Sequence, residues 1–200
     1  MTKFKSYNKE KNRDTVDKKA FIFGLMSVFL CGMGFSIISP VVPFLVEPYV
    51  SNASEQAFFV TLLTSVYAIC VFFVAPGLGA LSDRYGRRPI LLICLLGSSI
   101  GYLIFGIGGS IWVLFLGRII DGVTGGSIST IFAYFADITS KEERTKYFGW
   151  ISAIAGIGAA IGPTLGGVLA KFRYAVPMYF GAIITLLNFI YGILYMPESL

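Results

Sequence analysis

The sequence predicts an all-helical membrane protein with six transmembrane helices and both chain ends in the cytoplasm. Hydrophobic residues make up 56% of the chain and charged residues only 14%, well below the roughly 25% charge of soluble domains. The mean hydropathy is +0.76. The apolar residues form long runs, each near the roughly 20 residues that a helix needs to cross a bilayer. Lys and Arg also gather on alternate links between these runs, which indicates the orientation.

The six apolar runs occupy almost the whole chain after a polar tail. They span residues 20–46, 57–81, 89–108, 111–136, 147–170 and 176–196. Backbone groups in lipid must be hydrogen-bonded within the protein, and the runs lack the alternating polar and apolar pattern of a barrel strand, so each run is expected to be a helix. The links are short, which predicts antiparallel neighbours. The expected organisation is a cytoplasmic basic tail at 1–19, a six-helix domain at 20–196 and the start of a cytoplasmic linker at 197–200.

The orientation follows from the positive charges. They are dense in the tail, in the link after the second run and in the link after the fourth, whereas the opposite side carries only Lys171 and Arg173. Because Lys and Arg are enriched in cytoplasmic loops, both termini are predicted to be cytoplasmic. This topology accounts for the formal net charge of +5, so nucleic acid is not an expected partner.

Composition argues against several classes of chemistry. The chain has no His, and Cys31, Cys70 and Cys94 lie in three different apolar runs, where a thiol behaves as a small hydrophobic group. No metal-ligand spacing and no Gly-rich loop ending in Lys-Ser or Lys-Thr is present. We therefore expect no metal, no cofactor and no enzymatic activity.

The link between the second and third runs has the most informative pattern, Gly79-x-Leu-x-Asp83-Arg-x-Gly86-Arg87-Arg88. Its glycines permit a tight reversal of the chain, and its arginines offer forked, permanently charged partners for carboxylates. The pattern resembles the signature loop of the major facilitator superfamily of secondary transporters. That resemblance implies a cytoplasmic latch formed by Asp83 and Arg87.

Asp137, at the end of the fourth run, resembles the acidic partner of that latch. The same run contains Arg118 and Asp121, charged residues well inside an apolar segment. Such residues are costly in lipid and usually face a bundle interior or a wet cavity. At i and i+3 on a helix they can face and partly neutralise one another. The pattern Arg118-x-x-x-Gly122 resembles a superfamily motif whose arginine is assigned to proton coupling.

The fifth run reads Gly158-x-x-x-Gly162-Pro163-x-x-Gly166-Gly167. Glycines four residues apart let another helix approach closely, and the proline bends the helix. The order resembles the antiporter motif of drug:proton exporters in the superfamily, a group that includes tetracycline efflux proteins. This favours export over uptake.

Other polar and aromatic groups inside the runs are candidates for a substrate cavity. They are Phe35, Tyr67, Tyr134 and Asn188. For the aromatic residues, packing in the core or against lipid is the preferred interpretation.

The resemblance fails at two points. Cys31 stands where the first helix of related exporters often carries a carboxylate, which leads to the hypothesis that Asp121 carries the proton, with Arg118 adjusting its affinity. The chain is also about half as long as a superfamily member, which has two six-helix halves with the substrate site between them. The explanations are a self-pairing half, a half that needs a separate second half, or a truncated product or fragment, of which the last is favoured.

The predicted function is secondary-active, proton-coupled export of a small amphipathic compound from a bacterial inner membrane. The expected partners are the lipid bilayer, a small-molecule substrate, protons and a second six-helix half. The alternatives are a metabolite symporter or uptake carrier of the same superfamily, or a non-transporting half or assembly partner.

Overall fold

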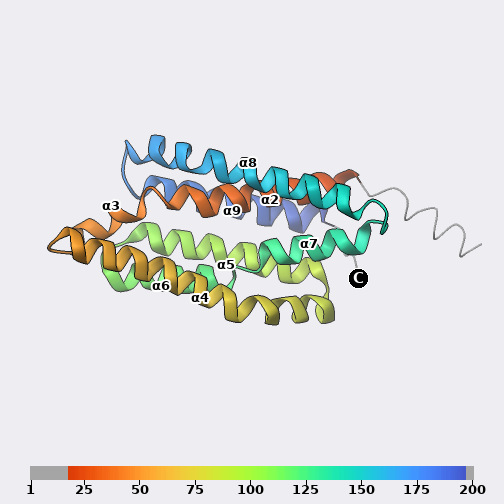
Figure 1. Ribbon diagram of the computed structural model, residues 1–200, viewed down its shortest axis with the longest axis horizontal. Coiled ribbons are helices and arrows are strands. Elements are labelled where there is room, and N and C mark those ends of the chain that lie inside the picture. The colour runs from red at the N-terminus through yellow and green to blue at the C-terminus, as the bar shows by residue number, and fades with distance from the viewer. Residues whose placement is uncertain (1–17, 197–200) are drawn as a thin grey trace, which may run out of the picture.

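The computed structural model describes residues 18–196, which form a bundle of long helices running up and down along one axis (Figure 1). The helices are α2 (Lys18–Ile38), α3 (Val42–Val46), the short 3-10 helix η1 (Glu47–Tyr49), α4 (Ala53–Tyr85), α5 (Arg87–Ile107), α6 (Ile111–Val123), α7 (Ser127–Ile138), α8 (Arg144–Ala170) and α9 (Val176–Tyr195). Within these residues there is no β-strand. The predicted linker at 197–200 and most of the basic tail lie outside the described residues.

Six helical segments are long and apolar enough to cross a membrane, which confirms the predicted number. The fourth segment, Ile111–Ile138, consists of α6 and α7 together. The start of α2 and the end of α9 lie at the same end of the bundle, as an even number of crossings requires (Figure 1). We call this end, where α4 meets α5, the basic end, and the other the α3 end.

The first and fourth predicted helices are each interrupted. α2 stops at Ile38, and α3 begins after a turn containing Pro40, which has no amide hydrogen to donate to a continuing helix. The fourth segment breaks between Val123 and Ser127, where Gly125 and Gly126 pass close to α4. A Cβ on Gly125 would lie 2.6 Å from Cγ2 of Val71, so the absence of a side chain permits this approach.

The predicted loop between the second and third runs is wrong in its extent. Helix α4 continues through Tyr85 and α5 begins at Arg87, so the reversal is made by one residue. That residue is Gly86, whose φ of 102° lies in the region that favours glycine. Gly79, which we expected to help the reversal, is instead within α4, with open space where a side chain would be.

Two apolar clusters form the core and leave a polar layer between them. The cluster toward the α3 end includes Ile37, Phe105, Leu114 and Met178. The cluster toward the basic end includes Phe23, Leu91, Leu95, Ile131 and Tyr134. Between these levels, the buried or half-buried side chains on α5, α6, α7 and α9 include Ser98, Ser99, Asp121, Ser127 and Thr185. The bundle thus has apolar packing toward each end and a group of polar side chains between the two clusters.

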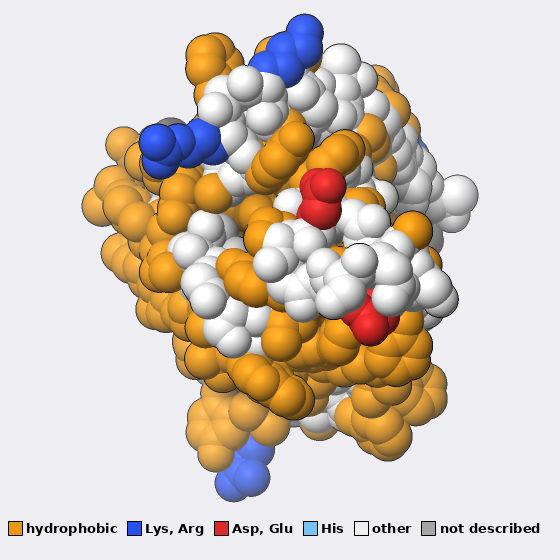
Figure 2. Space-filling view, turned by 90° about the vertical axis from the view of Figure 1, so that its left-hand side faces the viewer, with side chains coloured by type: hydrophobic (Ala, Val, Ile, Leu, Met, Phe, Trp, Pro, Cys, Tyr) orange, Lys and Arg blue, Asp and Glu red, His pale blue; other side chains and the backbone are white. Residues whose placement is uncertain are grey.

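The flanks of the bundle are hydrophobic. Figure 2 looks onto the α3 end and shows few charged side chains on it, with hydrophobic side chains covering the sides below. On α4, Phe72 and Phe73 are 73% and 74% exposed. Trp112 and Trp150, near ends of the fourth and fifth spans, are also exposed, as expected for aromatic groups at the membrane surface. These flanks suit lipid or another membrane helix rather than water.

Candidate functional site

The polar layer contains a buried ion pair on α6. Arg118 Nη1 lies 3.7 Å from Asp121 Oδ2, and the two residues are only 7% and 4% exposed. The predicted i and i+3 arrangement is therefore present. This distance is too long for a direct hydrogen bond. The two groups therefore attract one another by charge alone, and their hydrogen-bonding atoms are not taken up by this pair.

Aromatic rings hold the Arg118 guanidinium in place. Its central carbon lies 4.7 Å from the Phe105 ring centre and 5.6 Å from that of Tyr67. Cations are attracted to the faces of aromatic rings at such distances. The arginine is therefore oriented by rings from α4 and α5.

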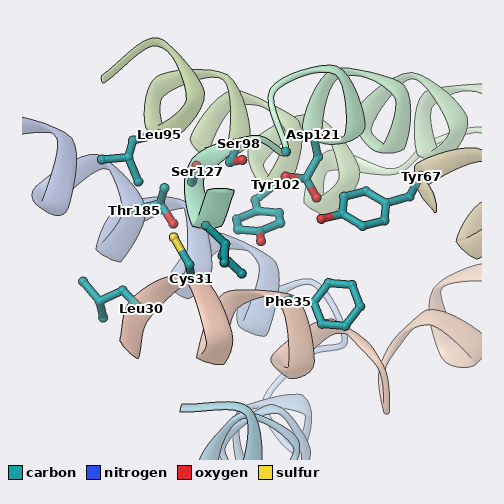
Figure 3. A pocket seen from close by; sticks show the side chains of 12 residues that line it. Leu30, Cys31, Phe35, Tyr67, Leu95, Ser98, Tyr102, Asp121, Ser127 and Thr185 are labelled. Atoms are coloured by element: carbon teal, nitrogen blue, oxygen red, sulfur yellow. The ribbon is translucent and has the colours of Figure 1, made fainter. Parts of the chain in front are cut away.

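Asp121 faces a cavity of about 70 Å³ in the centre of the bundle (Figure 3). Ser98, Cys31 and Ser127 also line this cavity. Figure 3 shows the Tyr67 hydroxyl and the Asp121 carboxylate pointing toward one another. This cavity is small, polar on several sides, and able to hold water or one small group.

A second cavity, of about 160 Å³, lies beside Arg118. Ser39, Thr64 and Val60 contribute to its wall. Phe35 and Tyr67 line both cavities, and their ring centres are 5.7 Å apart. This aromatic pair therefore lies between the cavity lined by the Asp121 carboxylate and the cavity lined by the Arg118 guanidinium.

The structure places the other two predicted cavity residues elsewhere. Tyr134 is 2% exposed and packs edge-on against Phe135 in the apolar cluster of the basic end. Asn188 is 1% exposed, and its Oδ1 accepts a hydrogen bond of 3.1 Å from the Ser27 hydroxyl. Neither residue lines either cavity described above.

The predicted latch residues meet at the basic end. Arg87 Nε donates to Asp137 Oδ2 over 2.8 Å, and Arg87 Nη1 pairs with Asp83. The same nitrogen donates to the Ser82 hydroxyl at 2.6 Å. One guanidinium therefore joins the end of α4, the start of α5 and the end of α7.

Arg88 hydrogen-bonds to a different helix from Arg87. Its Nη2 donates to the carbonyl oxygen of Ile193 over 2.5 Å, near the end of α9. A cation at this position is favourable because the last carbonyls of a helix carry partial negative charge. The two consecutive arginines thus connect the start of α5 to the ends of α4, α7 and α9.

The glycines of α8 lie against α2. A Cβ on Gly162 would lie 2.8 Å from the Met33 carbonyl oxygen, and added carbons on Gly158 and Gly166 would clash with the carbonyl oxygens of Phe29 and Ile37. Gly167, the last glycine of the pattern, has open space at this position. Pro163 is within α8 and exposed. Three of the four glycines therefore permit close contact between α8 and the backbone of α2, whereas Gly167 faces no neighbouring atom.

In the described part of the chain, no three His, Cys, Asp or Glu side chains come together as a metal site would require. The ionisable groups of the polar layer are instead arranged as one acid and one base beside cavities in a membrane bundle. Such intramembrane charges mark substrate, ion or proton pathways in transport proteins.

Residues 24–199 match the model of the Major Facilitator Superfamily. The chain belongs to this superfamily. Its members are transporters rather than enzymes, and the chain is a multi-pass membrane protein of this family. The resemblance inferred from the sequence motifs is confirmed.

Among curated superfamily proteins, the chain is 41% identical over 180 residues to the class C tetracycline resistance protein of Escherichia coli, matching 90% of this chain and 45% of that protein. It is 33% identical over 184 residues to multidrug resistance protein 2 of Bacillus subtilis, matching 92% and 45%. The chain thus spans about half the length of these relatives. A similar fold occurs in the crystal structure of the human organic anion transporter MFSD10, with a TM-score of 0.80, 22% identity, and 92% of this chain and 48% of that chain covered.

Sequence reasoning missed several polar residues of the central layer in this superfamily member. Ser98, Tyr102, Ser127 and Thr185 line the Asp121 cavity. Each is an uncharged polar group in a largely apolar run, a pattern that signals a polar lining only when the rotation of the helix is known. The break before Ser127 makes that rotation impossible to extrapolate along the fourth segment.

Proposed function

We propose that this chain is the proton-coupling half of an exporter of small amphipathic compounds. The observation that carries the proposal is the Arg118–Asp121 pair, buried in the middle of a membrane bundle beside two cavities. A pair of opposite charges could have a purely structural role. Here, however, the acid faces a cavity through which a proton could reach it.

Asp121 is the proposed proton carrier. The pair has zero net charge when Asp121 is ionised and a net positive charge when Asp121 is protonated. Because charge is costly in the low-dielectric bundle, loading or releasing this proton changes which arrangement of the surrounding helices is favoured. Cys31 lines the same cavity and provides no carboxylate, so Asp121 acts alone there.

The proposed direction of transport is outward, in exchange for protons. This rests on the glycine and proline pattern of α8, which here sits against α2, and on the names of the relatives, which confer resistance to tetracycline and to multiple drugs. The proposed substrates are flat, amphipathic compounds of the tetracycline type. The rings of Phe35 and Tyr67 supply aromatic contacts for such molecules.

The proposed partner is a second six-helix bundle. Helices α4 and α8 bury the smallest share of their surface among the six spans, and the chain matches only 45% of its first relatives. A second bundle against α4 and α8 would complete a cavity around Phe35, which is 55% exposed. The basic end, with Asp83, Arg87 and Asp137, would face the cytoplasm of a bacterial inner membrane and act as the latch.

Transport into everted membrane vesicles tests the proposal. Vesicles carrying the chain, alone or with a co-expressed C-terminal half of the class C tetracycline resistance protein, would be given a proton gradient and labelled tetracycline. We expect gradient-dependent accumulation with at least one of these combinations, lost in Asp121→Asn and retained in Arg84→Gln, a variant in the exposed last turn of α4. Accumulation that survives Asp121→Asn would refute the assignment of Asp121. Accumulation driven by a proton gradient of the opposite direction would show cotransport with protons instead of the proposed exchange.

A further inference from the structure

Arg118 has more hydrogen-bonding capacity than its described neighbours use. A guanidinium carries five N–H donors. Asp121, at 3.7 Å, is beyond hydrogen-bond distance, and no acceptor among the described residues pairs with Nε, which is fully buried. Leaving such donors without acceptors is costly in a protein interior. The side chain is therefore suited to receive an acceptor from a ligand.

The cavity beside Arg118 has walls that suit such an acceptor. No carboxylate lines it, and its polar members are the guanidinium and the hydroxyl groups of Ser39, Thr64 and Tyr67. The Thr64 hydroxyl donates to the Val60 carbonyl oxygen, so the guanidinium, Ser39 and Tyr67 are the groups that can donate to a ligand. The carboxylate of the pair instead lines the neighbouring cavity, across the Phe35–Tyr67 rings. The two spaces thus differ in charge preference, and the one beside Arg118 favours a negative group.

The size and remaining walls of this cavity indicate the rest of the ligand. Its volume is about 160 Å³, similar to the roughly 150 Å³ of an engineered protein cavity that binds benzene. Phe35 and Tyr67 form one aromatic side, and Val42 and Val60 add apolar surface. The space therefore fits one six-membered ring with its substituent near Arg118.

We propose that the cavity beside Arg118 is a binding subsite for an aromatic ring bearing an anionic oxygen group, such as a carboxylate or an enolate. The Arg118 guanidinium donates hydrogen bonds to the oxygen, and the rings of Phe35 and Tyr67 contact the flat body of the ligand. The inference names a substrate class for the proposed export function and so rests on it. It assigns Arg118 a ligand-binding role in addition to its pairing with Asp121.

Asp121 makes the subsite weaker than it would otherwise be. Its negative charge, 3.7 Å from Arg118, offsets part of the attraction that an anion would feel. Removing that charge should therefore strengthen anion binding. A purely structural ion pair would behave in the opposite way, since breaking it would loosen the site.

The test uses two probes of the same shape, benzoate and benzamide. The full chain would be purified in lipid nanodiscs, and binding of each labelled probe measured by equilibrium dialysis at neutral pH, with empty nanodiscs as the blank. We expect wild-type protein to prefer benzoate by roughly 10-fold, as a charge-assisted hydrogen bond allows. This measurement involves no transport, so a failure of the subsite and a failure of the export function can be told apart.

Four variants make the test specific. Arg118→Gln should bind the two probes equally, and Asp121→Asn should bind benzoate several-fold more tightly with benzamide unchanged. Arg84→Gln, on the exposed turn before Gly86, should match wild type. Tyr67→Phe keeps the ring and removes one donor, so it should reduce the preference without abolishing it. If Arg118→Gln does not fold, the Asp121→Asn result decides.

Three results would overturn the proposal. They are equal binding of benzoate and benzamide to wild-type protein, absence of binding by both probes, and weaker benzoate binding in Asp121→Asn. Any of them would leave Arg118 as a partner of Asp121 and of the rings of Tyr67 and Phe105 only.

Discussion

Arg87 and Asp137 are 50 positions apart in the chain and joined by a 2.8 Å hydrogen bond between Nε and Oδ2. The bond ties the first residue of α5 to the last turn of α7. Arg87 is 8% exposed, while Asp137 is more accessible to solvent. The guanidinium also contacts Asp83 and Ser82, so Arg87 is the centre of the cluster and each acid holds one side of it.

We expect Arg87→Ala to destabilise the bundle by about 2–4 kcal/mol and Asp137→Asn by about 1 kcal/mol. The arginine loses three partners at a buried position, whereas the acid loses one at a partly exposed position. Arg87→Lys should fall between these values, because one ammonium cannot reproduce the forked geometry. Thermal unfolding in detergent, with the exposed Glu142→Gln as control, measures the differences. Equal stability of Asp137→Asn and Glu142→Gln would show that the bond contributes nothing.

The glycines of α8 give a prediction with an internal control. Gly162→Ala places a methyl group 2.8 Å from the Met33 carbonyl oxygen, so α8 and α2 must separate. We expect a loss of roughly 1–3 kcal/mol from this overpacking. Gly156→Ala and Gly167→Ala meet nothing within 4 Å and should be neutral, or slightly stabilising through better helix propensity. Denaturation in mixed micelles compares the three variants, and similar losses in all of them would contradict the packing explanation.

The sequence predicted the six spans because each has a long apolar run, a property that does not depend on neighbouring helices. It also predicted that Arg118 and Asp121 share a face, since three residues make most of a helical turn. It could not predict the breaks in the first and fourth helices. The break at Gly125 depends on how closely α4 approaches, and glycine alone is compatible with both a continuous and an interrupted helix.

The cavities were harder to predict for a related reason. Phe35 and Tyr67 were candidates because they are aromatic and lie inside spans, and so was Tyr134. Only the three-dimensional structure separates them, by bringing the rings of Phe35 and Tyr67 within 5.7 Å of each other and leaving Tyr134 in an apolar cluster. Composition cannot distinguish a ring in a cavity wall from a ring in the core.

The buried pair of Ser27 and Asn188 gives a prediction about unsatisfied polar groups. Ser27 donates to Asn188 Oδ1, while Nδ2 of Asn188 has no acceptor among the described residues. Ser27→Ala should destabilise the bundle by about 0.5–2 kcal/mol, because it leaves the whole amide without a partner. Adding Asn188→Leu should recover much of that loss, because the unsatisfied amide is removed. A double-mutant cycle in detergent measures this, and additive losses would contradict it.

Cys31 and Cys94 should differ in their reaction with N-ethylmaleimide, a small thiol reagent. Cys94 is fully buried in α5, whereas Cys31 is partly exposed and lines the cavity next to Asp121. In single-cysteine variants, Cys31 should be labelled faster than Cys94 by about 10-fold or more, since access to the reagent limits the reaction. Mass spectrometry of samples quenched at intervals gives both rates.

Blocking the cavity with Phe35→Trp should slow Cys31 labelling and leave that of Cys94 unchanged, because Phe35 lines the Cys31 cavity and Cys94 does not. Equal rates at the two thiols would mean that the cavity is closed to solutes in the membrane.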